Sequence, residues 1–415
     1  MLMRRSFALA AVLVLLAACT GDEAPPAATA ADPLAGYAEA LATAGSEPVA
    51  YVREKLAEHD LLLFDDGLHN AVEPFDLYRR LLADSAIASE LDFVFLEAVP
   101  INGQPEIDAY LAAADDDPTL LHGAFQDDTS GFGLAYGTYF DLLAAVREAN
   151  ARLPAEERIA VVAVSNPTYW REIETPRDVE LFRLGLVGRD YDMYRIILSH
   201  MEDFAAGKKG LFLTNTRHAY TGVRRADGSF YWNSGTFLRQ HHPGRTWSLR
   251  VHGPALFIES AEAKPGAAET TDGLGRYEYR WGRMADGLWD RAFAAHGEPV
   301  ALPLAGNPFG ATGYVGNHMA EAAPGQTMAD AYDALVYLAP MEELRQARSV
   351  GAIYTPGFRR EVARRLALLY TPQQVEGLLA GDGVETVEEW TALLAAGEPE
   401  APSAQAQALV ESPEG

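Results

Sequence analysis

The sequence predicts an α/β protein with a mainly parallel central sheet flanked by helices, in a single domain with a C-terminal insertion or extension. Short apolar segments alternate along the chain with segments of helical periodicity, which is the pattern of strands joined by crossover helices. The chain has 415 residues and one cysteine, so a packed core rather than disulfide bonds must stabilise it. Strands separated by helices pair most readily in parallel, so we expect one sheet covered on both faces.

The strands and helices of this sheet follow from the pattern in chain order. Strands are expected at 61–64, 93–96, 159–164, 211–213, 246–251, 255–258 and 334–338, and helices at 73–83, 139–150 and 189–204. The first four strands should be neighbours in one sheet, because helices separate them in the sequence. The segment around 260–330 is poor in strand patterns and is predicted to be an insertion.

The N-terminus has the pattern of a bacterial lipoprotein signal. Arg4 and Arg5 precede an apolar run of 12 residues at 7–18, which is too short to span a bilayer as a helix. The run ends in Leu-Ala-Ala and Cys19, the pattern at which a lipoprotein signal is cleaved and the cysteine is acylated. We therefore predict a signal peptide at 1–18, a disordered tether at 19–45, the α/β domain at 46–395 and a disordered tail at 396–415.

The composition limits the partners and the location of the protein. The net charge of −26 repels nucleic acid and anionic lipid headgroups, so no nucleic-acid partner is expected. An acyl anchor on Cys19 would instead hold the protein to the membrane. Because Thr20 rather than Asp follows the cysteine, we expect the periplasmic face of the outer membrane, in the cell envelope.

Polar residues that could carry chemistry lie at the ends of predicted strands or begin neighbouring helices. Asp66 and His69 follow the first strand, Glu97 ends the second, Arg189 begins a helix, and His218 follows the fourth strand. Because the carboxyl ends of parallel strands meet at one edge, these five side chains should line one pocket. A neutral imidazole can act as a general base, a carboxylate can orient it, and an arginine can stabilise an oxyanion.

Each of these residues also has a plainer explanation. Asp65 and Asp66 could begin a solvated loop, Glu97 could be a buried carboxylate with a structural partner, and His218 alone could be a structural histidine. Other motifs are set aside as turns or solvated loops: the glycines at 131–137, the acidic run at 115–117 and the histidine pair at 241–242. The segment 317–319 (Asn-His-Met) could line the site from the insertion.

The order of these motifs resembles a superfamily that unites erythromycin esterases, ChaN-like haem-uptake lipoproteins, TraB-type proteins and Tiki peptidases. The family's first motif, a strand ending in Gly-Glu with a nearby His, is matched by Asp65, Asp66 and His69, and its strand ending in Glu is matched by Glu97. The remaining matches cover about residues 50–345 and comprise Arg147 with Asn150, the group of Arg189, Asp190 and Met193, the pair Asn215 and His218, and the segment 333–337.

The resemblance implies a membrane-anchored envelope hydrolase acting on an ester, lactone or amide of a small molecule or peptide. His69 would be the general base, Asp66 would orient it, Glu97 and His218 would complete the site, and Arg189 would polarise the scissile carbonyl. The Tiki branch implies a divalent metal held by His69, Glu97 and His218, and the esterase branch implies none. The ChaN-like branch implies instead a lipoprotein that binds haem, iron or another ligand without catalysis. Asp66 in place of Glu, and Asn215 where esterases often carry a second His, put catalysis and metal dependence in question.

Overall fold

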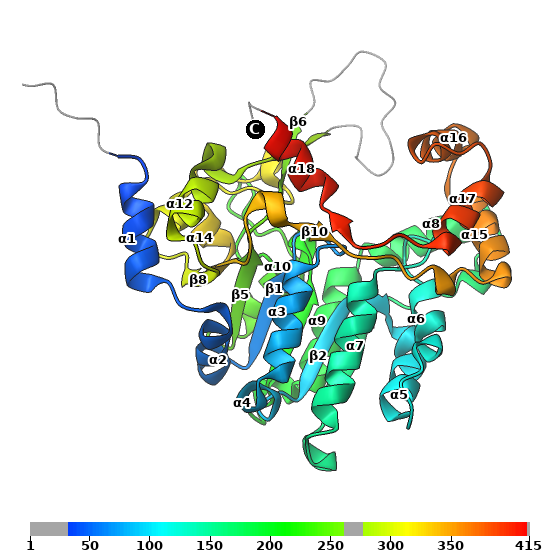
Figure 1. The fold of residues 1–415 in the computed structure, drawn as a ribbon, viewed down its shortest axis with the longest axis horizontal. Helices are drawn as coiled ribbons and strands as arrows, with labels where there is room; N and C mark the ends of the chain where they lie inside the picture. The colour runs from blue at the N-terminus through cyan, green and yellow to red at the C-terminus, as the bar shows by residue number, and fades with distance from the viewer. Residues whose placement is uncertain (1–31, 261–276, 413–415) are drawn as a thin grey trace, which may run out of the picture. The chain divides into compact units, whose positions relative to one another are not determined.

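A seven-stranded sheet forms the centre of the protein (Figure 1). The computed structural model describes residues 32–260 and 277–412, and Pro33–Gly415 form one compact unit. The strand order is β3-β2-β4-β1-β5-β9-β8, in which all pairs are parallel except the last. The predicted fold class is confirmed. The predicted signal peptide, Cys19 and most of the tether lie outside the described residues.

The strands coincide closely with the predicted segments. Their bounds are β1 Leu61–Asp65, β2 Phe93–Pro100, β3 Ala160–Ser165, β4 Gly210–Thr214, β5 Thr246–Val251, β8 Val300–Pro303 and β9 Ala334–Tyr337. The first four are neighbours in the sheet, as expected. Every residue of β1 and β4 is buried, because helices cover both faces of the sheet at its centre.

The segment predicted to be a strand-poor insertion contributes to the central sheet, so that part of the prediction is wrong. β8 lies within it and pairs antiparallel with β9 at the sheet edge. The predicted strand at 255–258 is β6 (Ala255–Ser260), which leaves the central sheet and pairs with β7 (Tyr277–Gly282) in a separate antiparallel ribbon. Its apolar residues indicated burial, but nothing local indicated which sheet would bury them.

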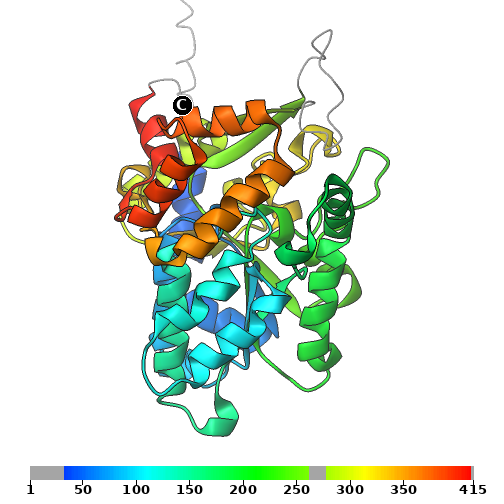
Figure 2. The same ribbon diagram turned by 90° about the vertical axis from the view of Figure 1, so that its right-hand side faces the viewer.

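The helices lie on both faces of the sheet and continue beyond its carboxyl edge (Figures 1 and 2). Their bounds are α1 Ala35–Ala44, α2 Pro48–Glu58, α3 Glu73–Ala83, α4 Ser85–Ala88, α5 Gln104–Ala112, α6 His122–Gln126, α7 Gly137–Asn150, α8 Pro176–Leu186, α9 Arg189–His200, α10 Thr216–Ala219, α11 Ser234–His241, α12 Leu288–His296, α13 Pro308–Ala311, α14 Met328–Ala331, α15 Pro356–Leu369, α16 Pro372–Gly381, α17 Val387–Ala396 and α18 Ala404–Glu411. The predicted helix at 189–204 thus ends at His200, and a short 3₁₀ turn follows.

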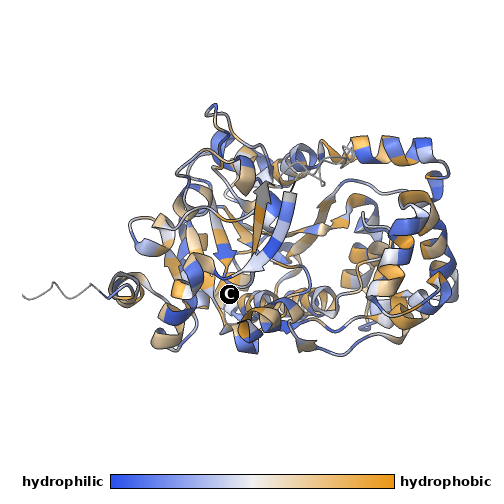
Figure 3. Cartoon of the chain, turned by 90° about the horizontal axis from the view of Figure 1, so that it is seen from above, coloured by the Kyte–Doolittle hydropathy of each residue, from blue (hydrophilic) through white to orange (hydrophobic). Residues whose placement is uncertain are grey.

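Apolar side chains on the two faces of the sheet form separate cores. Helices α2, α3 and α7 pack against one face, where Tyr139, Leu142, Leu143 and Val146 of α7 are buried at helical spacing. On the other face α9 buries Met193 with its neighbours against β1–β4. The outer helices carry hydrophobic and hydrophilic residues in alternation (Figure 3), as amphipathic helices do. Within the described residues, no helix is long and apolar enough to cross a membrane.

Both terminal segments are more ordered than their composition suggested, which corrects the predicted tether and tail. Residues 35–44 form α1, whose Tyr37, Ala40 and Leu41 are buried against the core near β8. In the tail, β11 (Ala401–Pro402) pairs with β10 (Arg345–Gln346), and α18 buries Ala406 and Leu409. A few small apolar residues at helical spacing are enough to order these helices, because the domain provides a surface against which the residues are buried.

Candidate active site

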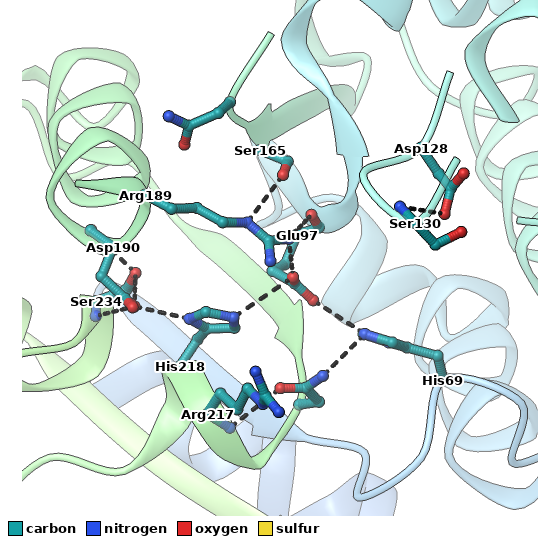
Figure 4. A network of polar contacts seen from close by, with 12 residues as sticks. His69, Glu97, Asp128, Ser130, Ser165, Arg189, Asp190, Arg217, His218 and Ser234 are labelled. Atoms are coloured by element: carbon teal, nitrogen blue, oxygen red, sulfur yellow. Dashed lines mark hydrogen bonds and ion pairs between the residues drawn. The ribbon is translucent and has the colours of Figure 1, made fainter. Parts of the chain in front are cut away.

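The carboxyl ends of β1, β2 and β4 bring the predicted residues into one polar cluster. Figure 4 shows its members His69, Glu97, Arg189 and His218. Asp66 follows β1, and Glu97 lies in β2 where the pairing with β3 shifts register between Leu96 and Pro100. His218 lies on α10, directly after β4, and Arg189 begins α9. Such an irregularity in a strand re-aims side chains and is common beside functional sites.

Glu97 is the centre of this cluster and is only 1% exposed. Arg189 donates from Nη2 to Glu97 Oε1, His218 Nε2 lies 3.5 Å from the same oxygen, and His69 Nε2 lies 3.2 Å from Oε2. Burial alone would raise the pKa of Glu97, but the charges of Arg189, His69 and His218 hold it well below its usual range. Glu97 therefore stays ionised. Figure 4 shows it between the imidazoles of His69 and His218.

His218 is buried and is oriented by Asp190. The distance from His218 Nδ1 to Asp190 Oδ1 is 2.7 Å, and the same oxygen accepts from the backbone N–H of Ser234 at 2.7 Å and from its hydroxyl at 2.9 Å. Burial opposes ionisation of Asp190, but His218 and Ser234 lower its pKa, so it remains a carboxylate. A carboxylate at Nδ1 fixes a proton there and orients the ring so that Nε2 faces Glu97.

His69 has a different environment, with a side chain that is 25% exposed. Its Nδ1 lies 3.0 Å from the Tyr139 hydroxyl. Burial disfavours the imidazolium, but the charges and contacts of Glu97 and Asp66 outweigh it and raise the pKa of His69 to about 10. At neutral pH His69 is therefore protonated, which disagrees with the predicted role of general base.

Asn215 favours release of the proton that His69 holds on Nε2. Its Oδ1 caps α10 by accepting from the Arg217 backbone N–H at 3.0 Å, which turns its Nδ2 toward His69 Nε2 at 2.9 Å. This amide can donate to Nε2 only after the imidazole has lost its proton there. The carboxylates of Glu97 and Asp66 thus stabilise His69 as a cation, and Asn215 can donate a hydrogen bond to the neutral ring that forms when the proton leaves. This combination suits a general acid.

The two aspartates after β1 differ from their predicted roles. Asp66 Oδ2 lies 3.6 Å from His69 Nδ1, beyond hydrogen-bond distance, so Tyr139 rather than Asp66 is the hydrogen-bond partner of that nitrogen. Burial raises the pKa of Asp66 to about 6. Asp65 is fully buried, accepts from the Tyr332 hydroxyl at 2.6 Å and lies 3.7 Å from Arg250. Neither aspartate begins a solvated loop.

Arg189 is committed to positioning Glu97. Its Nε donates to the Ser165 hydroxyl at 3.0 Å, and its Nη2 donates to the Glu97 carboxylate and to the Glu97 main-chain oxygen at 3.2 Å. These bonds hold the guanidinium against β2 and β3. Arg189 also lines the cavity beside His218, and its role in polarising a scissile carbonyl stays a prediction.

A cavity of about 580 Å³ lies beside His218, and Arg189, Asp190, Arg217, Trp232 and Tyr279 also line it. Asn317 and His318 contribute from the segment after β8, so the sequence motif that could line the site does so. Asp66 lines a different and smaller cavity of about 40 Å³. The five predicted residues are therefore one connected cluster, but they do not all line the same cavity.

Unpaired polar atoms gather in the cluster. Within the part of the chain that the structure describes, five buried side-chain atoms here have no hydrogen-bond partner: both Asp66 oxygens, Glu97 Oε2, Thr214 Oγ1 and His218 Nε2. Buried polar groups are usually paired, because an unpaired one costs about 1–3 kcal/mol. A concentration of such atoms around two imidazoles is typical of a site that binds and transforms a polar ligand.

The cluster does not fit the metal or the haem that the resemblance implied. No group of three or more His, Cys, Asp or Glu side chains in residues 32–260 and 277–412 is arranged to hold a metal ion. Glu97 Oε1 is already paired with the guanidinium of Arg189. A metal cation bound to the same carboxylate would be repelled by that positive charge. Haem iron would need an accessible imidazole nitrogen, but both nitrogens of His69 have partners within 3.0 Å and His218 is 5% exposed.

Other motifs have structural roles. Arg147 donates to the main-chain oxygens of Ala114 and Asp115, and Asn150 pairs with the backbone of Ile159, so this motif braces loops away from Glu97. The glycines that follow Asp128 form a turn whose amides donate to its carboxylate (Figure 4). The histidine pair ends α11, where the ring of His242 lies 3.0 Å from the Tyr194 hydroxyl.

Three residues of the site have no distinctive sequence signal. Tyr139 appeared to be an ordinary core residue of a helix, and Ser165 and Ser234 appeared to be unremarkable polar residues. Their roles depend on partners that are 70, 24 and 44 residues away along the chain. Asp190 was part of a recognised motif, but nothing local indicated that it would pair with His218.

Comparison with known proteins identifies neighbours of the structure but none of the sequence. No model of a protein family matches the sequence, and no curated protein matches it. A succinoglycan biosynthesis protein superimposes with a TM-score of 0.48 at 9% identity, covering 73% of this chain and 96% of that chain. A Bacillus cereus protein superimposes with a TM-score of 0.45 at 11% identity, covering 74% of this chain and 97% of that chain. A mutant of the erythromycin esterase EreC in its open conformation superimposes with a TM-score of 0.44 at 11% identity, covering 69% of this chain and 92% of that chain. Likeness at this level assigns no activity to the chain.

Proposed function

We propose that the protein is a hydrolase that cleaves a carboxylic ester, lactone or amide with two imidazoles, His218 as general base and His69 as general acid. One observation carries this proposal: the Nε2 atoms of two histidines with different partners at Nδ1 lie beside opposite oxygens of one ionised carboxylate, Glu97. Such separation of protonation states by environment is how acid and base roles are assigned within one site.

The proposed reaction begins at the cavity that His218 lines. His218 Nε2 takes a proton from water as the water oxygen bonds to the substrate carbonyl carbon, and Asp190 stabilises the imidazolium that forms. The tetrahedral intermediate then collapses, and the leaving oxygen or nitrogen takes the Nε2 proton of His69. Asn215 donates to the neutral His69 that remains. Loss of the proton on His218 to solvent and uptake of one by His69 restore the starting state.

These roles differ from those that the sequence indicated. The role of base moves from His69 to His218, and the orienting carboxylate becomes Asp190 instead of Asp66. The pKa of His69, raised to about 10, supports the change, as does its 3.6 Å separation from Asp66. Glu97 acts on both rings, because its charge stabilises whichever imidazole holds the proton.

We also propose that this hydrolase is anchored in the cell envelope through an acylated Cys19. The support is the sequence alone: two arginines, an apolar run and a cysteine in the order of a lipoprotein signal. The acyl chains would keep the catalytic domain close to the membrane surface without a membrane-spanning helix.

The test is hydrolysis by the wild type and by two variants, His69→Gln and His218→Gln, on a panel of 4-nitrophenyl esters, lactones and anilides. Each variant should lower kcat by about 100- to 10,000-fold, since each removes one proton transfer. Asp190→Asn should behave like His218→Gln, because it removes the carboxylate that holds the Nδ1 proton. His296→Ala is the matched control, a histidine exposed at the end of α12 that should leave activity unchanged.

Thermal unfolding distinguishes chemistry from folding. Glutamine retains a side-chain hydrogen-bonding group at each position, so the melting temperatures should change little while activity falls. Wild-type rates in both variants, or no hydrolysis of any substrate by the wild type, would contradict the proposed function.

A further inference from the structure

Arg217 is an exposed cation at the cavity beside His218, its neighbour on α10. Within residues 32–260 and 277–412, no carboxylate lies within ion-pair distance of its guanidinium. Acidic residues outnumber basic ones in this chain by 59 to 33, and Arg189, which lines the same cavity, is by contrast ion-paired with Glu97. Figure 4 shows the Arg217 side chain on the same side of the cluster as His218.

The acidic side chains of the cavity are already occupied. Asp190 accepts from Ser234 and pairs with His218, and Glu321 accepts from the Tyr231 hydroxyl at 2.8 Å. Neither carboxylate lies within ion-pair distance of Arg217, so no acidic side chain of this wall holds its guanidinium. Its effect is visible on His318, whose pKa is lowered by burial and by the charges of Arg225 and Arg217, with Asp190 opposing them.

Aromatic rings border the same cavity. Trp232, just before α11, is 46% exposed, and Tyr279, on β7, is 45% exposed. Trp232 stacks on Phe237 and His241, which holds its ring in place, and exposed aromatic rings can bind apolar or ring-shaped groups. The cavity thus combines an apolar border with an unpaired arginine.

We propose that Arg217 binds an anionic group of the substrate, so that the substrates are anionic esters or amides with an apolar portion held by Trp232 and Tyr279. This inference rests on the proposed function, because it places the anionic group next to the reacting carbonyl. The planar guanidinium can donate two parallel hydrogen bonds to a carboxylate, a geometry that lysine cannot reproduce. The chain's overall negative charge repels anions, so any preference for an anion must arise locally.

Binding tests the inference without relying on catalysis. Phenylacetate and phenylacetamide have nearly the same shape and differ in charge, and calorimetry can compare their affinities for the full chain. Wild type should bind phenylacetate about tenfold more tightly than phenylacetamide. Arg217→Ala should abolish this preference, and Arg217→Lys should retain part of it.

Arg224→Ala is the matched control for charge. Arg224 is an exposed arginine of a nearby loop that stacks on Phe230 and does not line the cavity. Its removal lowers the net positive charge of the region equally but should leave the preference intact. Equal affinity for both probes, binding of neither probe, or an equal loss in Arg224→Ala would overturn the inference.

Hydrolysis separates this inference from the proposed function. We expect Arg217→Ala to raise KM for mono-4-nitrophenyl glutarate about tenfold and to leave KM for 4-nitrophenyl hexanoate unchanged. If both esters are hydrolysed with the same KM by wild type and variant, the inference fails and the function stands. If phenylacetate binds through Arg217 but no ester is hydrolysed, the anion site stands and the proposed function fails.

Discussion

His69 and His218 are the same kind of side chain beside the same carboxylate, and their other neighbours separate their roles. Asp190 lies 2.7 Å from Nδ1 of His218 and orients the ring so that Nε2 faces Glu97. His69 instead has Tyr139 at Nδ1, with Asp66 and Glu97 close enough to keep the ring charged. Under the proposed function these different partners make His218 the base and His69 the acid, because protonation responds to the local field.

The raised pKa of His69 predicts how stability depends on pH. In the folded protein its pKa is about 10, against an ordinary value of 6.5. The folded state therefore binds this proton more tightly than the unfolded state, so the contribution to stability is complete below pH 6.5 and is lost as pH rises toward 10. Urea unfolding at several pH values between 6.5 and 10 should show a steeper loss of stability for wild type than for His69→Gln.

His296→Ala again provides the comparison for this measurement, because His296 is exposed. Its profile between pH 6.5 and 10 should parallel that of wild type. A His69→Gln profile as steep as that of wild type would show that His69 is not a cation in the folded protein.

Among the secondary-structure elements, the short ones decide the site. α10 has four residues, yet it carries both His218 and Arg217, and its position depends on Asn215, which caps it and contacts His69. Like α10, the helices α1 and α18 near the two termini are short. They are ordered because the domain buries one side of each. Isolated helices of this length would be unstable in water.

The order of the C-terminal segment can be tested within α18. Leu409 is 6% exposed and its neighbour Val410 is 40% exposed, so the two positions form a matched pair. Leu409→Ala should lower the free energy of unfolding by about 2 kcal/mol, whereas Val410→Ala should cost less than about 0.5 kcal/mol. Chemical denaturation measures both.

A disordered tail would give a different result. In that case the two substitutions would have equally small effects, and brief digestion with a protease would remove residues after 400 at the same rate from both variants and the wild type.

In the whole molecule, a compact α/β domain follows a predicted lipid anchor, and its acidic surface gives no attraction to anionic headgroups. The net charge is −26, so attachment to a membrane would depend on the acyl chains of Cys19. We expect Cys19→Ser to release the protein from the membrane fraction of expressing cells without changing the activity of the purified domain.

Mass spectrometry of the N-terminus checks the anchor directly. An acylated cysteine at the start of the mature chain is the expected result. An unmodified N-terminus at another residue, or an unchanged membrane fraction for Cys19→Ser, would contradict the anchor.

The sequence by itself determined the four strands β1–β4 and the edge of the sheet at which the site lies. Apolar runs such as 61–64 and 211–213 predicted strands, since a buried strand needs an apolar side chain at every position, and the helices between them predicted parallel pairing. From that pairing it followed that Asp66, Glu97 and His218 would lie near one another. These inferences succeeded because they depend on local periodicity and on a general rule of chain connection.

Only the tertiary structure decided which groups pair and which segments are ordered. Asp190 and His218 are 28 residues apart, and no local pattern distinguishes Asp190 from Asp66 as the carboxylate that orients an imidazole. Likewise, β8 and α18 are too short and too weakly apolar to predict alone, yet β9 and the surface near Met341 and Leu344 bury them. Protonation, hydrogen bonding and burial are properties of a three-dimensional environment, so the roles proposed for His69 and His218 rest on neighbours that only the tertiary structure brings together.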